Sequence, residues 1–80
     1  MKLPIIKALA ESKTLSELKQ AEEFLCNEQP LPFEVGGDDE GEQLTHILGA
    51  IDILERVENE KIDLKTATRA FFERVRNSIS

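Results

Sequence analysis

The sequence predicts an all-α fold, a small helical bundle of three main helices with a short N-terminal helix before them. Apolar residues recur at helical spacing along four stretches of the chain, and one Pro/Gly-rich connector separates the second stretch from the third. Leu, Ile, Val and Phe account for 24 of the 80 residues, which exceeds the roughly 20% below which disorder is expected. Because the chain is short and has no internal repeat or flexible linker, residues 1–80 are predicted to form a single domain.

The first predicted helix is short and begins near Pro4, since proline suits the first helical position, where its missing N–H would be unpaired in any case. Three apolar residues come after it at helical spacing, namely Ile5, Ile6 and Leu9. Ser12-Lys13 then interrupts the pattern. A helix this short is marginal alone in water, so we expect it to dock on the rest of the domain.

The second predicted helix begins at Thr14-Leu15-Ser16-Glu17, a sequence typical of a capping box. In this motif the Thr14 hydroxyl accepts from the backbone N–H of Glu17, and the Glu17 carboxylate accepts from the backbone N–H of Thr14. The helix is expected to reach about Asn27, with one apolar stripe formed by Leu15, Leu18, Ala21 and Leu25. Cys26, the single cysteine, lies at the edge of this stripe and is interpreted as core filler; a lone cysteine favours a reducing compartment.

Residues 29–41 form the connector, because its two prolines cannot lie inside a helix and three glycines interrupt its second half. Within it, Leu31, Phe33 and Val35 alternate with other residues at the period of an extended segment with one apolar face. Inward packing is favoured, since so short a chain has few apolar groups to spare. The alternative is an exposed apolar patch or strand edge, so these three are candidate partner-binding residues.

The third predicted helix runs from about Glu42 to Glu60 and is the most apolar element. It carries two apolar stripes, one made of Leu44, Ile47, Leu48, Ile51 and Leu54 and the other of Ala50, Ile53 and Val57. Two stripes are expected of a central helix that contacts several neighbours. Gly49 is unfavourable inside a helix, and close backbone approach by another helix would explain it.

The fourth predicted helix begins after Asp63, a good N-cap, and is expected to form an antiparallel hairpin with the third. Its apolar face comprises Leu64, Ala67, Phe71, Val75 and Ile79, with Phe72 at the flank. On the other side, Lys65, Arg69 and Arg76 form a basic ridge, with Glu73 near enough to pair with Arg69. These three cations are candidate partner contacts. No aromatic residues lie between them for base stacking, so nucleic acid is not the expected partner.

Parts of the chain resemble a small family of uncharacterised bacterial domains of unknown function, largely from the Bacteroidetes. The resemblance lies in MKLPIIK at residues 1–7, in GAIDILERV at residues 49–57 and in TATRAFFERV at residues 66–75. It covers about half of the chain, namely residues 1–7 and roughly 48–79. The resemblance implies a compact helical domain in a bacterial cytoplasm, and it assigns no activity, cofactor or functional residue.

Four carboxylates fall within five residues of the connector: Asp38, Asp39, Glu40 and Glu42. Oxygen ligands on a flexible loop suit a hard cation such as calcium. The spacing fails for a calcium loop, because Gly41 in the sixth position puts Gly36 first and Ile47 twelfth, where an aspartate and a glutamate are needed. The favoured interpretation is that Asp38 or Asp39 caps the third helix while Glu40 and Glu42 interact with the positive end of its dipole, with metal binding as the alternative.

No pattern of an enzyme is visible. His46, the single histidine, aligns on a helical wheel with Ala50, Ile53 and Val57, which makes it a residue at the boundary of the second apolar stripe rather than a catalyst. The acidic neighbours of Cys26 disfavour its thiolate. The sequence has no phosphate loop, nucleophile elbow or zinc spacing. We therefore expect no catalytic activity and no cofactor.

Charge is unevenly distributed. Residues 20–60 carry twelve carboxylates and one arginine, a net charge of −11, whereas residues 1–19 carry +2 and residues 61–80 carry +3. An overall charge of −6 disfavours a nucleic-acid or anionic membrane partner, because each phosphate contact needs a cation. The chain lacks the apolar run of a signal peptide and the roughly 20 apolar residues of a membrane span, so a cytoplasmic location is expected.

The leading functional prediction is a non-enzymatic protein–protein interaction or scaffolding module that binds a protein partner or a second copy of itself as a homodimer. It depends on the two apolar faces of the third helix and on the lack of a catalytic pattern. One alternative is a regulatory ligand or divalent-cation binder that works through residues 38–42. Another is an acidic mimic of nucleic acid that occupies a basic protein.

Overall fold

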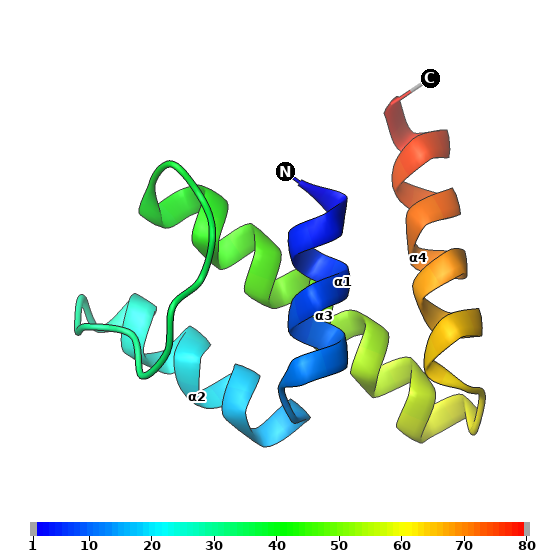
Figure 1. The fold of residues 1–80 in the computed structure, drawn as a ribbon, viewed down its shortest axis with the longest axis horizontal. Helices are drawn as coiled ribbons and strands as arrows, with labels where there is room; N and C mark the ends of the chain where they lie inside the picture. The colour runs from blue at the N-terminus through cyan, green and yellow to red at the C-terminus, as the bar shows by residue number, and fades with distance from the viewer. Residues whose placement is uncertain (1, 80) are drawn as a thin grey trace.

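The computed structural model describes residues 2–79, and the side chains of residues 2–78. It contains four helices, α1 (Leu3–Ser12), α2 (Leu15–Cys26), α3 (Glu40–Glu60) and α4 (Leu64–Ile79), and no strand within the described range. This confirms the prediction of a small all-α bundle (Figure 1). None of these helices is both long enough and apolar enough to cross a membrane. The sequence predicts Ile79 on the apolar face of the fourth helix, but its side chain lies outside the described part of the structure.

Helix α3 is central, as its two apolar stripes predict. It contacts α1, α2 and α4, whereas of the other helices only α1 and α4 contact each other. The molecule is flat, with extents of 32 × 29 × 16 Å. Figure 1 shows α4 turning steeply away from the end of α3 after a short turn, and the antiparallel hairpin stays a prediction.

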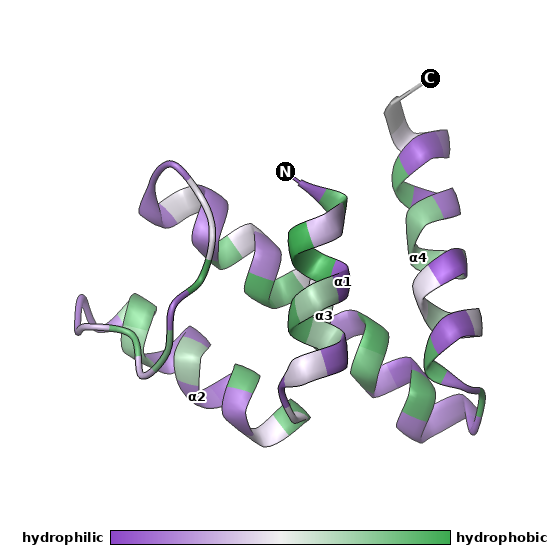
Figure 2. Cartoon of the chain, viewed as in Figure 1, coloured by the Kyte–Doolittle hydropathy of each residue, from purple (hydrophilic) through white to green (hydrophobic). Residues whose placement is uncertain are grey.

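Apolar side chains from every helix meet on α3. The buried core comprises Ile6, Leu9 and Ala10 of α1, Leu18 and Ala21 of α2, Val35 of the connector, Ile47, Ala50, Ile51 and Ile53 of α3, and Ala67 and Phe71 of α4. Figure 2 shows hydrophobic residues gathered where α1 crosses α3. The short helix α1 is therefore docked, as expected, and burial of its apolar face replaces the stability that it lacks alone.

Helices α2, α3 and α4 begin at side-chain caps. The predicted capping box is confirmed, because Glu17 N–H donates to Thr14 Oγ1 over 3.2 Å and Thr14 N–H donates to Glu17 Oε1 over 2.9 Å. At α4, Thr66 N–H donates to Asp63 Oδ1 over 2.7 Å. Helix α3 begins two residues earlier than the predicted Glu42, at Glu40, because Asp39 is its cap.

The caps shift three carboxyl groups. The backbone N–H and the hydroxyl of Thr14 lower the pKa of Glu17, and the backbone N–H of Asp38 lowers the pKa of Glu42. The hydroxyl and the backbone N–H of Thr66 lower the pKa of Asp63. Each group therefore holds its proton less tightly in the folded chain than in the unfolded chain.

Acid is expected to destabilise the domain through these three groups. Their ordinary pKa values are 4.5 for Glu17 and Glu42 and 3.8 for Asp63. Because the folded-state values are lower, the unfolded chain binds protons first, and the stabilisation present near neutral pH is lost as the pH falls through and below these values. The measurement is the urea midpoint, followed by circular dichroism from about pH 7 to about pH 3.

A variant with Glu17→Gln, Glu42→Gln and Asp63→Asn is expected to lose less stability over this range than the original chain. The matched control replaces three carboxylates whose side chains make no hydrogen bond or ion pair in the described part of the chain: Glu23→Gln, Glu34→Gln and Glu58→Gln. Equal acid sensitivity in both triple variants would contradict the assignment to the caps.

The connector packs inward, as the sequence favours. Val35 is only 4% exposed, and Leu31 and Phe33 are partly buried against the core. Gln43 Nε2 donates to the Val35 carbonyl over 3.2 Å, and the Lys13 ammonium lies 4.5 Å from the centre of the Phe33 ring. Residues 31–35 therefore contribute mainly to the core of their own chain.

Three residues are placed differently from their sequence predictions. Leu48, predicted in an apolar stripe of the third helix, is 43% exposed, because it lies about 100° round α3 from the buried Ile47, on the side away from Ala50. Cys26, predicted as core filler, is exposed, because it lies in the last turn of α2, about 80° round the helix from the buried Leu18 and on the side away from Ala21. His46, predicted at a boundary, is 0% exposed, because α1 and the connector both cover it.

Candidate functional site

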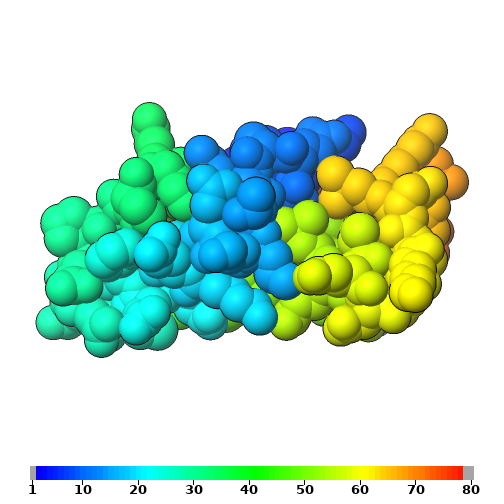
Figure 3. Space-filling model, turned by 90° about the horizontal axis from the view of Figure 1, so that it is seen from below, coloured from blue at the N-terminus to red at the C-terminus, as the bar shows by residue number. Residues whose placement is uncertain are grey.

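A groove of about 710 Å³ lies between α1 and α4. Both helices pack on α3, and they contact each other less extensively than either contacts α3, which leaves the space between them open. Figure 3 shows this space as a notch between the blue side chains of α1 and the yellow and orange side chains of α4. We refer to it as the α1/α4 groove.

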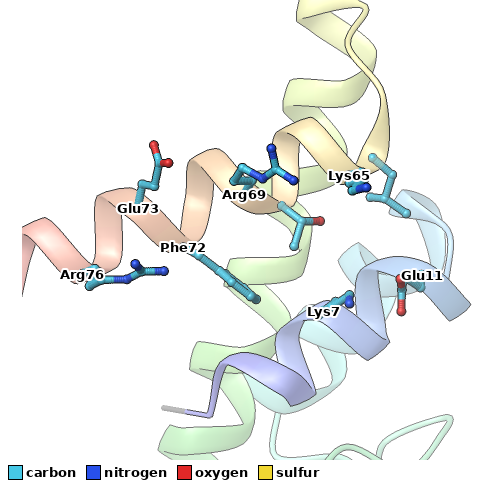
Figure 4. Close-up of a pocket in the computed structure, with 9 residues that line it drawn as sticks. Lys7, Glu11, Lys65, Arg69, Phe72, Glu73 and Arg76 are labelled. Atoms are coloured by element: carbon cyan, nitrogen blue, oxygen red, sulfur yellow. The ribbon is translucent and has the colours of Figure 1, made fainter.

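The floor of the α1/α4 groove is partly apolar. Leu64, Thr68 and Phe72 of α4 line it, and Figure 4 shows the Phe72 ring pointing from α4 toward α1. Phe71 is 9% exposed in the core, and consecutive residues of a helix point about 100° apart. Core burial of Phe71 therefore turns Phe72 to the side of α4 that faces α1.

The rim of the groove carries four cations, Lys7 of α1 and Lys65, Arg69 and Arg76 of α4. None of them is among the ion pairs of the described residues, in contrast to Lys2, Lys19, Arg56 and Arg74, which all pair with carboxylates. The three α4 cations are the predicted basic ridge, and the structure brings them together on one groove. Lys7 is not among the candidates that the sequence predicts, because its position beside α4 depends on where α1 docks.

Two carboxylates, Glu11 and Glu73, also line the groove. The pairing of Glu73 with Arg69 that the sequence predicts is not among the ion pairs of the described residues, and Figure 4 shows Glu73 pointing away from α1. Four cations and two carboxylates give the lining a net charge of +2, although the whole chain carries −6.

The α4 side of the groove is an extended stripe. Lys65, Arg69, Phe72 and Arg76 lie at positions i, i+4, i+7 and i+11 of one helix, a spacing that keeps them on one face. Eleven residues of α-helix rise about 16 Å. The stripe therefore presents three separated positive charges and one aromatic ring over roughly three helical turns. The prediction that no aromatic residue lies between the cations is wrong, because Phe72 lies between Arg69 and Arg76 on this face.

The carboxylates at the end of the connector take part in capping the start of α3. Glu42 N–H donates to Asp39 Oδ1 and Asp38 N–H donates to Glu42 Oε1, each over 2.8 Å. The Lys2 ammonium lies 3.8 Å from Asp38 and 4.0 Å from Glu42, and Glu40 lies in the first turn of α3. No group of three or more potential metal ligands is gathered among the described residues.

His46 links three segments of the chain. Its Nε2 accepts from the backbone N–H of Lys2 over 2.9 Å, and its Nδ1 lies 2.7 Å from the carbonyl oxygen of Gly36. Since a backbone N–H can only donate and a carbonyl can only accept, the ring is neutral with its proton on Nδ1. Both ring nitrogens are engaged, so His46 holds α1 and the connector on α3 and offers no free base.

The candidate residues of the connector and of α4 do not form one site. Leu31, Phe33 and Val35 pack on the core under the connector, whereas the basic ridge faces α1. The α1/α4 groove combines exposed charge, an apolar floor and a hollow, and it is therefore the candidate functional site.

A family model described as a family of unknown function (DUF6952) matches residues 1–80. The chain belongs to this family over its full length. Comparisons with curated proteins and with solved structures gave no match.

Proposed function

We propose that the protein is a non-enzymatic protein-interaction module whose α1/α4 groove binds an acidic amphipathic helix of a protein partner. The observation that carries the proposal is the row of four cations, unpaired among the described residues, beside a partly apolar floor. An acidic helix would place carboxylates against the cations and an apolar side chain against Phe72, which is the helix-in-groove mode of recognition.

The length of the basic stripe supports a helix over a small anion. Lys65 and Arg76 lie about 16 Å apart along α4, so one carboxylate or phosphate would engage one or two of the cations. A helix of about eleven residues has the same length as the stripe and would reach all of them. Its acidic residues would need only the usual i, i+4 spacing.

Composition supports a protein partner over nucleic acid. Of the groove residues only Phe72 is aromatic, whereas single-stranded nucleic acid is usually held by several stacked rings. The acidic remainder of the chain would repel a long polyanion more than a short acidic helix. A bacterial cytoplasmic setting is part of the proposal and is supported by the single cysteine.

Peptide binding tests the proposal. The probe is a labelled helical peptide of about 15 residues with Leu at i, i+4, i+7 and i+11 and Glu at the flanking positions. We expect it to bind with amide NMR shifts confined to α1 and α4, and to bind more weakly as salt is raised. A peptide with Lys in place of each Glu is expected not to bind.

Charge reversal locates the binding surface. Arg69→Glu is expected to weaken binding of the acidic peptide by about tenfold, measured by fluorescence anisotropy. Lys61→Glu is the matched control, because Lys61 comes directly after α3 and does not line the groove. Equal losses for the two variants, or no binding by the original chain, would overturn the proposed function.

A further inference from the structure

The described residues without an ion pair are only partly sorted by sign, since Glu11 and Glu73 also line the groove, but the groove lining is net positive and the α2 end is net negative. The unpaired cations of the α1/α4 groove lie along α1 and α4. Carboxylates without an ion pair in the described part of the chain occur on α2 and the connector, at Glu22, Glu23, Glu28 and Glu34. Figure 1 shows the C-terminal part of α2 and the adjoining loop at one end of the long axis and α4 at the other. The molecule thus has a basic end and an acidic end.

The acidic end is itself an amphipathic acidic helix. The inner face of α2 packs on α3 through the buried Leu18 and Ala21, while Glu23 is exposed and Phe24 is partly buried. Phe24 and Glu23 line a shallow hollow of about 170 Å³ with neighbouring amides. The outer side of α2 therefore offers the Glu23 carboxylate beside the Phe24 ring, and an acidic group beside an apolar one is complementary to the groove.

We infer that the occupant of the α1/α4 groove is a second copy of this chain, which docks residues 20–28 of its α2 end against the basic stripe. The inference rests on the proposed function and names its partner. The helical part of this segment ends at Cys26 and rises about 10 Å, so it covers part of the stripe. The two surfaces cannot meet within one molecule, because they lie at opposite ends of a body 32 Å long, so each contact joins the groove of one copy to the α2 end of another.

The contact is expected to be weak and strongly dependent on salt. The inner face of α2 is already used by its own core, so few apolar groups remain for the partner and charge supplies most of the attraction. Small polar interfaces of this kind belong to the transient class, with a dissociation constant on the order of 100 µM. Screening at about 0.5 M salt shortens the Debye length to a few ångström and should abolish the contact.

Sedimentation equilibrium tests the inference with interference optics, since the chain has no Trp or Tyr. The original chain is expected to rise above monomer mass with concentration at low salt and to return to monomer at high salt. The groove variant, Lys65→Glu with Arg69→Glu, and the acidic-end variant, Glu23→Lys with Glu28→Lys, are each expected to stay monomeric. Circular dichroism and thermal melts establish that both variants are folded.

Mixing the two variants gives the decisive result. Each reversed surface then meets a complementary one, so the mixture is expected to associate at least about tenfold more tightly than either variant alone. The control pair, Lys61→Glu and Glu58→Lys, is expected to associate as the original chain does. Mixed variants that fail to associate would overturn the inference.

The outcomes separate this inference from the proposed function. A chain that is monomeric at low salt and about 1 mM, yet binds the acidic peptide in the groove, overturns the second copy as occupant and leaves the proposed function standing. Self-association that the groove variant retains overturns the groove as the contact. A chain that neither associates nor binds the peptide overturns both.

Discussion

Gly49→Val is expected to destabilise the domain by about 1–3 kcal/mol, the usual cost of overpacking a close-packed core. A Cβ at Gly49 would lie 3.0 Å from Ile6 Cδ1 and 3.0 Å from Phe71 Cζ. Valine adds two further methyl groups beyond that atom, and its higher helix propensity than glycine offsets only about 0.3 kcal/mol of this cost. The sequence predicts a close backbone approach at Gly49, whereas the atoms that lie close belong to the side chains of Ile6 in α1 and Phe71 in α4.

The measurement is the urea midpoint followed by circular dichroism. Gly49→Ala adds only the Cβ, so its steric cost opposes a helix-propensity gain of about 1 kcal/mol and the net change is expected to be small. Gly41→Ala is the matched control, because its Cβ meets a single atom at 3.4 Å, and it is expected to stabilise. An unchanged midpoint for Gly49→Val would show that α1 and α4 are not held against α3 at this point.

His46→Leu is expected to destabilise the domain by about 1–3 kcal/mol, because two part-buried hydrogen bonds of about 0.5–1.5 kcal/mol each are lost. Leucine fills the space of the ring and leaves the Lys2 N–H without an acceptor and the Gly36 carbonyl without a donor. The two losses act on different segments, so both α1 and the connector should loosen. Urea unfolding and NMR shifts of residues 2–6 and 35–37 are the measurements.

Gln43→Leu provides the comparison. Gln43 also holds the connector on α3, through one hydrogen bond to Val35, and its loss is expected to cost about 1 kcal/mol. The nitrogen shifts of the His46 ring should also show a neutral imidazole with its proton on Nδ1. A cost for His46→Leu no larger than that for Gln43→Leu would contradict the role of His46 in joining three segments.

Features set by near neighbours could be predicted from the sequence. The capping box at Thr14 and Glu17, the cap at Asp63 and the end of α3 at Glu60 depend on residues within one helical turn. The basic ridge of α4 can be derived from the helical period alone. The start of α3 was displaced by two residues, because residues up to Gly41 were assigned to the connector, whereas Glu40 and Gly41 belong to the first turn of the helix after the Asp39 cap.

Features that depend on distant residues could not be predicted in this way. The environment of His46 is formed by residues 2 and 36, which are 44 and 10 positions away. The α1/α4 groove requires Lys7 to face a helix that begins at Leu64, and neither periodicity nor spacing relates the two. Composition predicted an acidic protein, whereas folding gathers cations on one side of it.

The α1/α4 groove is built by two helices that are held in place mainly by α3. Because α1 and α4 contact each other less extensively than either contacts α3, local opening of either helix removes one wall of the groove while α2 and α3 remain packed. Binding competence therefore depends on the docking of α1 and α4 on α3. An occupant that bridges the two helices would raise the free energy of opening either one, which makes α1 and α4 a single cooperative unit only in the bound state.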